Sequence, residues 1–104
     1  MSTKGIISWH NPTTNTDGSA FDANAQAGGF ELQFDGAGVV DFLFTAGVNV
    51  FDMNTLDAYK ALAEGPHNVA LAIVNKSGVA SAFSAPVTFQ VTKTPDAPSA
   101  VAVD

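Results

Sequence analysis

The chain has no cysteine and no arginine among its 104 residues. The absence of cysteine excludes disulfides, thiol nucleophiles and cysteine-held metals, and it suits synthesis in a reducing compartment. Four lysines stand against ten acidic residues, which gives a net charge of −6. Because phosphate and base recognition depend on clustered Lys and Arg, we expect no nucleic-acid partner.

Long apolar runs are also lacking. No run approaches the roughly 18 residues that a transmembrane helix requires, and Met1–Lys4 is followed by no apolar stretch typical of a signal peptide. We therefore expect a protein made in the cytoplasm, with no membrane partner. Charged residues make up only 13% of the chain and hydrophobic residues 46%, a composition that weakly favours a protein lying against other proteins.

What the chain does contain suits one small β-rich domain. A length of 104 residues fits a single core, and eight Phe and one Trp supply its bulk. We place this domain at residues 1–92 and treat residues 93–104, which contain two prolines, as a separate C-terminal tail.

The stretch Gly65–Val91 predicts two antiparallel strands joined by a tight turn. Val69–Val74 is apolar on both faces, which is typical of a strand in the middle of a β-sandwich. Asn75–Gly78 has turn chemistry, with a glycine free to take a positive φ. Val87–Val91 alternates with polar residues and predicts a half-buried strand.

Other segments upstream have the pattern of strands: Gly5–Trp9, Phe30–Asp35, Val39–Thr45 and Val48–Met53. The second and third should form a hairpin around Gly36-Ala37-Gly38. Inward positions predict a core made of Trp9, Phe30, Leu32, Phe34, Phe42, Leu71, Ile73 and Phe89. Replacing Leu71 by Ala is then expected to cost about 2–5 kcal/mol.

The only helical signal is Asn54–Glu64. Asn54 can cap the helix, and Asp57 in the first turn favours the helix dipole. One face would carry Leu56, Tyr59, Leu62 and Ala63, and Gly65-Pro66 would end the helix. With no β-α-β alternation, these elements predict an all-β fold, an antiparallel β-sandwich of roughly seven strands with one short helix.

The polar stretch Thr13–Gly29 predicts a long loop, and such loops often carry function. Its Asn15, Asp17 and Phe21 are candidate partner-binding residues, although a mobile loop tip is the alternative interpretation. Asp17, Asp22 and Asn24 could offer oxygens to Ca²⁺, but their spacing matches no EF-hand loop. We expect no bound metal.

Catalytic patterns are not found in the sequence. His10 and His67 are the only histidines, and no G-x-S-x-G nucleophile elbow accompanies them. We interpret His67 as a packing or capping residue and His10 as the border of a loop. The sequence therefore predicts no enzymatic activity and no cofactor.

Two stretches resemble a known family. Gly65-Pro66-His67 through Asn75, followed by Gly78, Ser81, Ser84 and Val87–Val91, resembles the last two strands of a fibronectin type III domain. Ile6–Ser19 is similar to the Trp-bearing strand and following loop of fibronectin-type modules in bacterial and phage proteins. The resemblance covers roughly the first fifth and the last third of the chain, and it implies a fibronectin III or Ig-like sandwich.

The tail resembles the entry to a second such module. Pro95 and Pro98 precede an alternation that ends in Val101 and Val103, whereas Met1–Lys4 is too short for the family's first strand. We expect Pro95–Val103 to act as an assembly element, and its two prolines and two valines are further candidate partner-binding residues. The segment could pair within its own chain or with a neighbour, or it could be a disordered terminus.

The resemblance implies a function as well. A solitary module of this composition resembles capsid decoration proteins and tail or fibre accessories of tailed phages. It implies a virion location, many copies or a homo-oligomer on a particle, and contacts with capsid or tail proteins. The alternative is a carbohydrate- or cell-surface-binding module acting through residues 13–29. A spacer cut from a longer protein is a weaker interpretation, because the chain opens with Met1.

Overall fold

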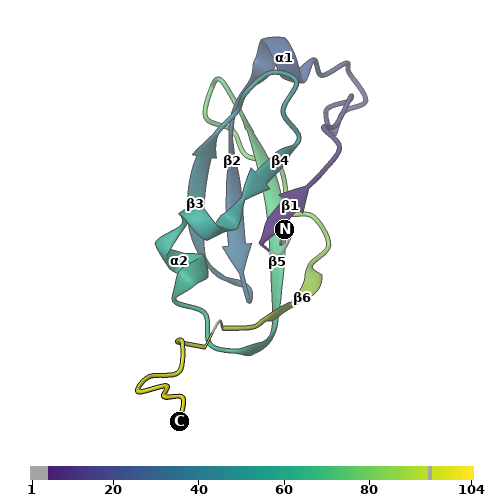
Figure 1. The fold of residues 1–104 in the computed structure, drawn as a ribbon. Coiled ribbons are helices and arrows are strands. Elements are labelled where there is room, and N and C mark those ends of the chain that lie inside the picture. The colour runs from purple at the N-terminus through teal and green to yellow at the C-terminus, as the bar shows by residue number, and fades with distance from the viewer. Residues whose placement is uncertain (1–4, 94) are drawn as a thin grey trace.

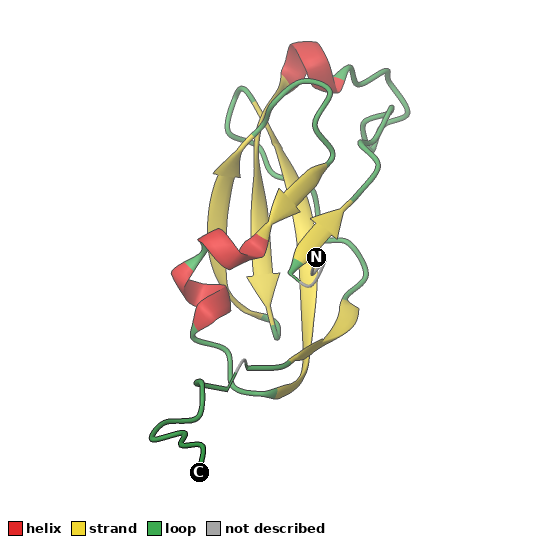
Figure 2. Ribbon diagram, viewed as in Figure 1, coloured by secondary structure: helices red, strands yellow, loops and turns green. Residues whose placement is uncertain are grey.

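The protein is mostly β, with two antiparallel sheets (Figures 1 and 2). The computed structural model describes residues 5–93 and 95–104. The strands are β1 Ile6–Ser8, β2 Ala27–Phe34, β3 Ala37–Leu43, β4 Val50–Asp52, β5 Gly65–Asn75 and β6 Val87–Val91. The helical segments are α1 Ala23–Gln26, the 3-10 turn η1 Met53–Thr55 and α2 Asp57–Lys60. The larger sheet has the strand order β3-β2-β5-β6, and the smaller one pairs β1 with β4.

Strand β2 carries three large buried core side chains. Phe30, Leu32 and Phe34 are 2%, 0% and 7% exposed, as their alternation with polar residues predicts. The strand begins at Ala27, however, because α1 delivers the chain directly into the sheet. The prediction of an irregular loop over the whole of Thr13–Gly29 is therefore wrong in its last third.

The β2–β3 hairpin turns at Asp35-Gly36. Both residues have positive φ, 54° and 71°, and Phe34 pairs directly with Ala37. Two left-handed residues make the tight turn whose twist matches a hairpin, and Asp-Gly is a favoured pair for it. The hairpin was predicted correctly, but its turn lies one residue before Gly36-Ala37-Gly38. An extra residue at Gly38 (φ 70°) then shifts the register of β3.

Strand β5 lies inside the larger sheet, between β2 and β6, as predicted. Its alternate residues Ala70 and Ala72 are buried. The predicted tight link to β6 is wrong. The chain does turn sharply after Asn75, where the Asn75 side chain accepts hydrogen bonds from the backbone N–H groups of Ser77 and Val79, but β6 starts only at Val87.

The two sheets face each other through apolar side chains. Ile7 and Phe51 of the smaller sheet pack against the buried cluster of Leu32, Phe34, Met53 and Val69. Trp9 lies 4.8 Å from Phe30, measured between ring centroids. The two sheets do not cover each other completely. Five predicted core residues are only partly buried: Trp9, Phe42, Leu71, Ile73 and Phe89.

The predicted helix at Asn54–Glu64 forms only in pieces. Leu56 has an extended backbone and separates η1 from the four-residue α2. Asp52 accepts from the Asn54 N–H and caps η1, so Asn54 is not the cap, and Gly65-Pro66 begins β5. Leu56, Tyr59 and Leu62 do pack on the core, whereas Ala63 is exposed. Helices this short are unstable without packing, which explains why only the core-facing turns persist.

The C-terminal tail leaves the end of β6 and extends away from the two sheets (Figure 1). Residues 95–104 contain no helix or strand, and all of them are exposed. The predicted strand at residues 100–103 is therefore not formed within this chain.

Candidate functional site

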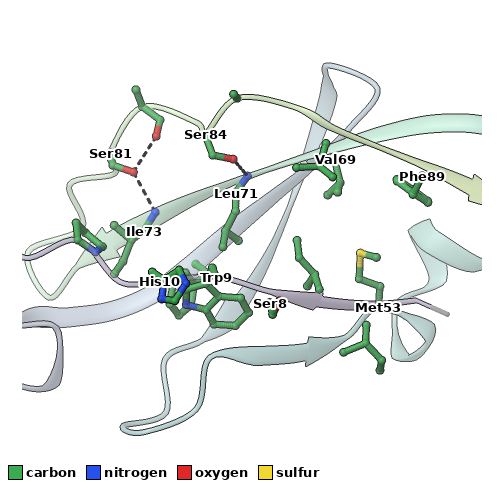
Figure 3. A pocket seen from close by; sticks show the side chains of 17 residues that line it. Ser8, Trp9, His10, Met53, Val69, Leu71, Ile73, Ser81, Ser84 and Phe89 are labelled. Carbon is green, nitrogen blue, oxygen red and sulfur yellow. Dashed lines mark hydrogen bonds between the residues drawn. The ribbon is translucent and has the colours of Figure 1, made fainter. Parts of the chain in front are cut away.

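A groove of about 760 Å³ opens between β1 and the segment that leads into β6 (Figure 3). Phe30 of β2 and Val69, Leu71 and Ile73 of β5 are among its lining residues, and residues 81–89 line it on the side away from β1. Among the residues that the structure describes, no Asp, Glu, Lys or Arg lines the groove. The open groove is the reason why Leu71, Ile73 and Phe89 are only half-buried.

Two serines hold the far wall of the groove. Ser84 donates its N–H to the Leu71 carbonyl over 2.9 Å, and its Oγ accepts from the Leu71 N–H over 3.0 Å. Ser81 does the same for Ile73, at 2.8 Å and 3.1 Å. Because a hydroxyl takes the place of a backbone carbonyl, residues 81–86 follow β5 without forming a ladder (Figure 3). The backbone N–H and C=O groups of Leu71 and Ile73 are therefore hydrogen-bonded without a neighbouring strand on this side, and the groove stays open.

The other wall is the free edge of β1. This strand pairs with β4 alone, and no other strand in the described part of the chain pairs with it. Trp9 N–H donates to the Asn49 carbonyl over 3.1 Å, and Gly5 accepts from Met53 N–H over 2.7 Å. By the alternation of an antiparallel ladder, the backbone groups of Ile6 and Ser8 face away from β4. Such an edge is ready to pair with another strand.

A second hollow of about 390 Å³ extends the groove. It shares Pro12, Ile73, Ser81 and Ala82 with the first. Asn15 and Phe21 line its far part. Together the two hollows form one continuous depression, which we call the β1 groove, running from β6 to the connection that precedes α1.

The predicted loop residues have internal roles. Asp17 accepts hydrogen bonds from the Ser19 backbone and hydroxyl, which hold the pKa of its carboxyl below the ordinary value. Asn15 donates to Ser19 Oγ and to the Ala20 carbonyl. These bonds fix the connection, so Phe21 and Asn15 lie at the end of the β1 groove, while Asp17 does not line it.

The oxygens considered for Ca²⁺ do not converge. Asp22 accepts from the Asn24 N–H at the start of α1, and Asp17 is turned toward Ser19. Within residues 5–93 and 95–104, no group of three or more His, Asp or Glu side chains is placed to hold a metal ion.

The predicted tail residues lie away from the groove of their own chain. Val101 and Val103 are 80% and 94% exposed, and Pro95 and Pro98 precede them in the exposed tail. The tail leaves the molecule at the end opposite to α1 (Figure 1). The structure therefore does not bring the two sets of candidate residues together within one chain.

A His–Asp pair joins the β2–β3 turn to the first residues of β5. His67 Nδ1 lies 2.6 Å from Asp35 Oδ2, and His67 Nε2 lies 2.7 Å from the Ala63 carbonyl. Asp35 also accepts from the Asn68 N–H. Since both ring nitrogens face acceptors, the pair favours a protonated imidazole: the bond to Asp35 raises the pKa of His67, and the bond from His67 lowers the pKa of Asp35.

This pair predicts a pH dependence of stability. A raised His67 pKa contributes stability fully below pH 6.5 and loses it as pH rises through the folded-state pKa. A lowered Asp35 pKa contributes above pH 3.8 and loses it as pH falls through its own folded value. We expect the pair to stabilise the fold most between these pH values.

Urea denaturation at several pH values tests the pair. The His67→Gln variant should lose less stability than the wild type between pH 6 and pH 9, and Asp35→Asn, which keeps an acceptor for Asn68, should behave alike. Asp41→Asn removes an exposed carboxylate from β3 and serves as the charge control. Identical pH profiles for His67→Gln and wild type would contradict the assignment.

The other histidine lies in the groove. His10 lines the groove next to Trp9 (Figure 3) and is exposed. No hydrogen bond joins it to a serine or a carboxylate among the described residues. The groove thus contains hydroxyls and one imidazole, without the carboxylate that would orient the imidazole as a base.

Sequence reasoning missed two features of the structure, the two serines of the groove wall and the His67–Asp35 pair. Ser81 and Ser84 were noticed only as part of a family likeness, although their three-residue spacing beside an apolar strand is a readable signal. The His67–Asp35 pair joins residues 32 positions apart, and no local pattern announces it.

No helix in the described part of the chain is long and apolar enough to span a membrane. No protein-family model matches the sequence, and searches of curated proteins and of solved structures find no significant match. The features of the molecule that bear on its function are therefore the β1 groove, the free edge of β1 and the tail.

Proposed function

We propose that this protein is a non-enzymatic assembly protein that binds other polypeptide chains. The observation that carries the proposal is the β1 groove, an apolar hollow that no charged side chain of residues 5–93 and 95–104 lines, bordered by a strand edge that no strand of those residues pairs. Exposed apolar hollows are typical of interaction sites, and an unpaired edge binds extended peptide backbone.

The fold supports a specific version of this proposal, a fibronectin III or Ig-like β-sandwich. Trp9 follows β1, β1 pairs with β4, and this small sheet faces the sheet β3-β2-β5-β6. In such a sandwich the first strand would lie beside the Trp-bearing strand, which is where the free edge of β1 lies. The resemblance of Ile6–Ser19 and Gly65–Val91 to that family points the same way.

The absence of catalysis is part of the proposal. His67 has both ring nitrogens engaged by Asp35 and Ala63, so neither is available as a base toward a substrate. His10 lies in the groove without a carboxylate partner among the described residues. An activity abolished by His10→Ala or His67→Ala, in a protein that remains folded, would overturn this part.

For the biological setting we propose a tailed-phage virion, with the protein as a capsid decoration protein or a tail or fibre accessory present in many copies. The sequence resemblance supports this setting, and so does a groove suited to protein partners. Mass spectrometry of particles purified from cells that make the protein tests it. Peptides of this chain should co-purify with capsid or tail proteins, and their recovery only from the soluble fraction would contradict the setting.

A carbohydrate- or cell-surface-binding module is the second candidate. The observation that favours it is the ring of Phe21 beside polar Thr14, Asn15 and Thr16 in the smaller hollow, since sugars stack on aromatic rings. The internal hydrogen bonds of Asn15 count against it. Glycan-array binding that is lost in Phe21→Ala, with unchanged particle association, would favour this candidate over the first.

A further inference from the structure

The β1 groove has the length of a short strand. Its lining includes Val69, Leu71 and Ile73 of β5, and Asn75 lies at its far end. At about 3.3 Å per residue, the path from Val69 to Asn75 covers about 20 Å. A strand of six or seven residues can therefore lie along it.

We propose that the C-terminal segment Ser99–Val103 of a second copy of this chain occupies the β1 groove as an added strand on the free edge of β1. This inference rests on the proposed assembly function and names its partner. The groove and the segment belong to the same sequence, so every copy can donate one strand and accept another.

The chemistry of the two surfaces matches. In the described part of the chain the groove is lined by no Asp, Glu, Lys or Arg, and Ser99–Val103 contains none. In an extended strand, Val101 and Val103 project to one face and Ala100 and Ala102 to the other. The two valines, exposed in their own chain, would enter the groove, and the alanines would face outward.

The backbone of β1 offers the complementary hydrogen-bonding groups. Ile6 and Ser8 direct their N–H and C=O groups away from β4, and Ile6 is 46% exposed. An incoming antiparallel strand would pair with these groups. It would also cover Leu71, Ile73 and Phe89, which the isolated chain leaves half-buried.

Direction decides between a strand from the same chain and one from a neighbour. β1 runs opposite to β6, toward the end of the molecule that carries α1 (Figure 1). An antiparallel partner of β1 must therefore enter at the α1 end and run the way β6 runs. The tail leaves its own chain at the opposite end, where Gly65 pairs with Val91.

The tail is too short to make this turn within its own chain. From the level of Gly65 to that of Ile73 the path is about 26 Å, or eight residues. The thirteen residues after Val91 would spend eight on this path and at least two on the reversal, which places Val101 in the turn. A second copy placed beyond the α1 end avoids this limit.

The resulting contact is head-to-tail. One copy's tail would pass the connection that contains Asn15 and Phe21 before it reaches β1 of the next copy, because these residues line the entrance of the groove. A heterologous contact of this kind closes into a ring or continues as a filament, according to the rotation between copies.

Cross-linking tests the proposal in a chain that has no natural cysteine. The double variant Ser8→Cys with Ala102→Cys places two thiols on the outward face of the paired strands, where neighbouring Cα atoms suit a disulfide. The double variant Ser8→Cys with Ala100→Cys tests a pairing register that is shifted by two residues. We expect oxidation to give a ladder of covalent oligomers. A monomer closed by an internal disulfide, or no cross-link with either position, would overturn the proposal.

Matched tail variants test the face of the strand. Val101→Asp should weaken self-association by at least about ten-fold in sedimentation experiments, because it forces a carboxylate into an uncharged groove. Ala102→Asp adds the same charge on the outward face and should change association less. Equal effects of the two variants would contradict the strand geometry.

The cross-linking experiment has its own control. The double variant Thr88→Cys with Ala102→Cys measures disulfides formed by random collision, since Thr88 is exposed on β6.

The outcomes separate this inference from the proposed function. A wild-type protein that stays monomeric at all concentrations overturns the inference even if the protein binds particles. A self-associating protein that is never found on particles overturns the virion setting and leaves the strand exchange supported.

Discussion

Replacing Phe30 by alanine is expected to lower the free energy of unfolding by about 3–5 kcal/mol. The ring is 2% exposed and lies 4.8 Å from Trp9 and 5.0 Å from Phe42, between ring centroids. Its removal takes away the contact through which the two sheets meet. Since domains of this size are stable by only about 5–15 kcal/mol, the variant should lose much of its margin.

Chemical denaturation followed by Trp9 fluorescence measures this loss. Leu43→Ala is the matched control, because Leu43 lies on β3 beside the same site but is 84% exposed. The control should change stability by less than about 0.5 kcal/mol. A loss below about 1 kcal/mol for Phe30→Ala would mean that the sheets do not pack through this ring.

The second large effect compares two leucines that face each other across neighbouring strands. Leu32 on β2 pairs with Leu71 on β5, yet Leu32 is fully buried and Leu71 only partly. We expect Leu32→Ala to cost about 2–5 kcal/mol. Leu71→Ala should cost less in the isolated chain, because a partly buried side chain contributes less transfer free energy.

The same comparison bears on the sequence-based expectation for Leu71, which assumed a closed core. At low protein concentration, the loss of unfolding free energy caused by Leu71→Ala should lie near or below the lower end of the expected range of about 2–5 kcal/mol. Equal losses for Leu32→Ala and Leu71→Ala in a monomeric sample would show that the β1 groove is closed in solution.

Local alternation predicted the strands that carry the core. Phe30, Leu32 and Phe34 alternate with polar residues, and burial on one face of a sheet needs nothing more than that pattern. Trp9 was predicted to face inward from the first strand, and it does pack against Phe30 of the larger sheet. Ile7, two residues earlier, packs on the buried cluster as well. The period-2 pattern is reliable in β2 because only one of its faces is apolar.

The turns and the helix were harder to predict from the sequence, because competing local signals overlap there. Asp35 follows the polar alternation of β2, so it reads as a strand residue, although Asp35-Gly36 makes the turn. The Asn54–Glu64 pattern fits a helix along its apolar face, but extended Leu56 breaks it. In both places the choice depends on backbone dihedral angles that residue types only bias.

The β1 groove could not have been derived from residue patterns. Leu71 and Ile73 have the pattern of fully buried residues, and only the arrangement of strands shows that the described chain leaves them partly exposed. The serine hydroxyls that replace ladder carbonyls depend on which β5 residues lie opposite Ser81 and Ser84. Such pairings are set by tertiary structure.

The bulge in β3 bears on aggregation. This strand is an outer edge of the larger sheet and carries exposed Val39 and Leu43, which would make a straight edge prone to uncontrolled stacking. The shifted register near Gly38 twists the strand locally, and the carboxylate of Asp41 places a charge on it. Both features disfavour fibre growth along this side of the larger sheet.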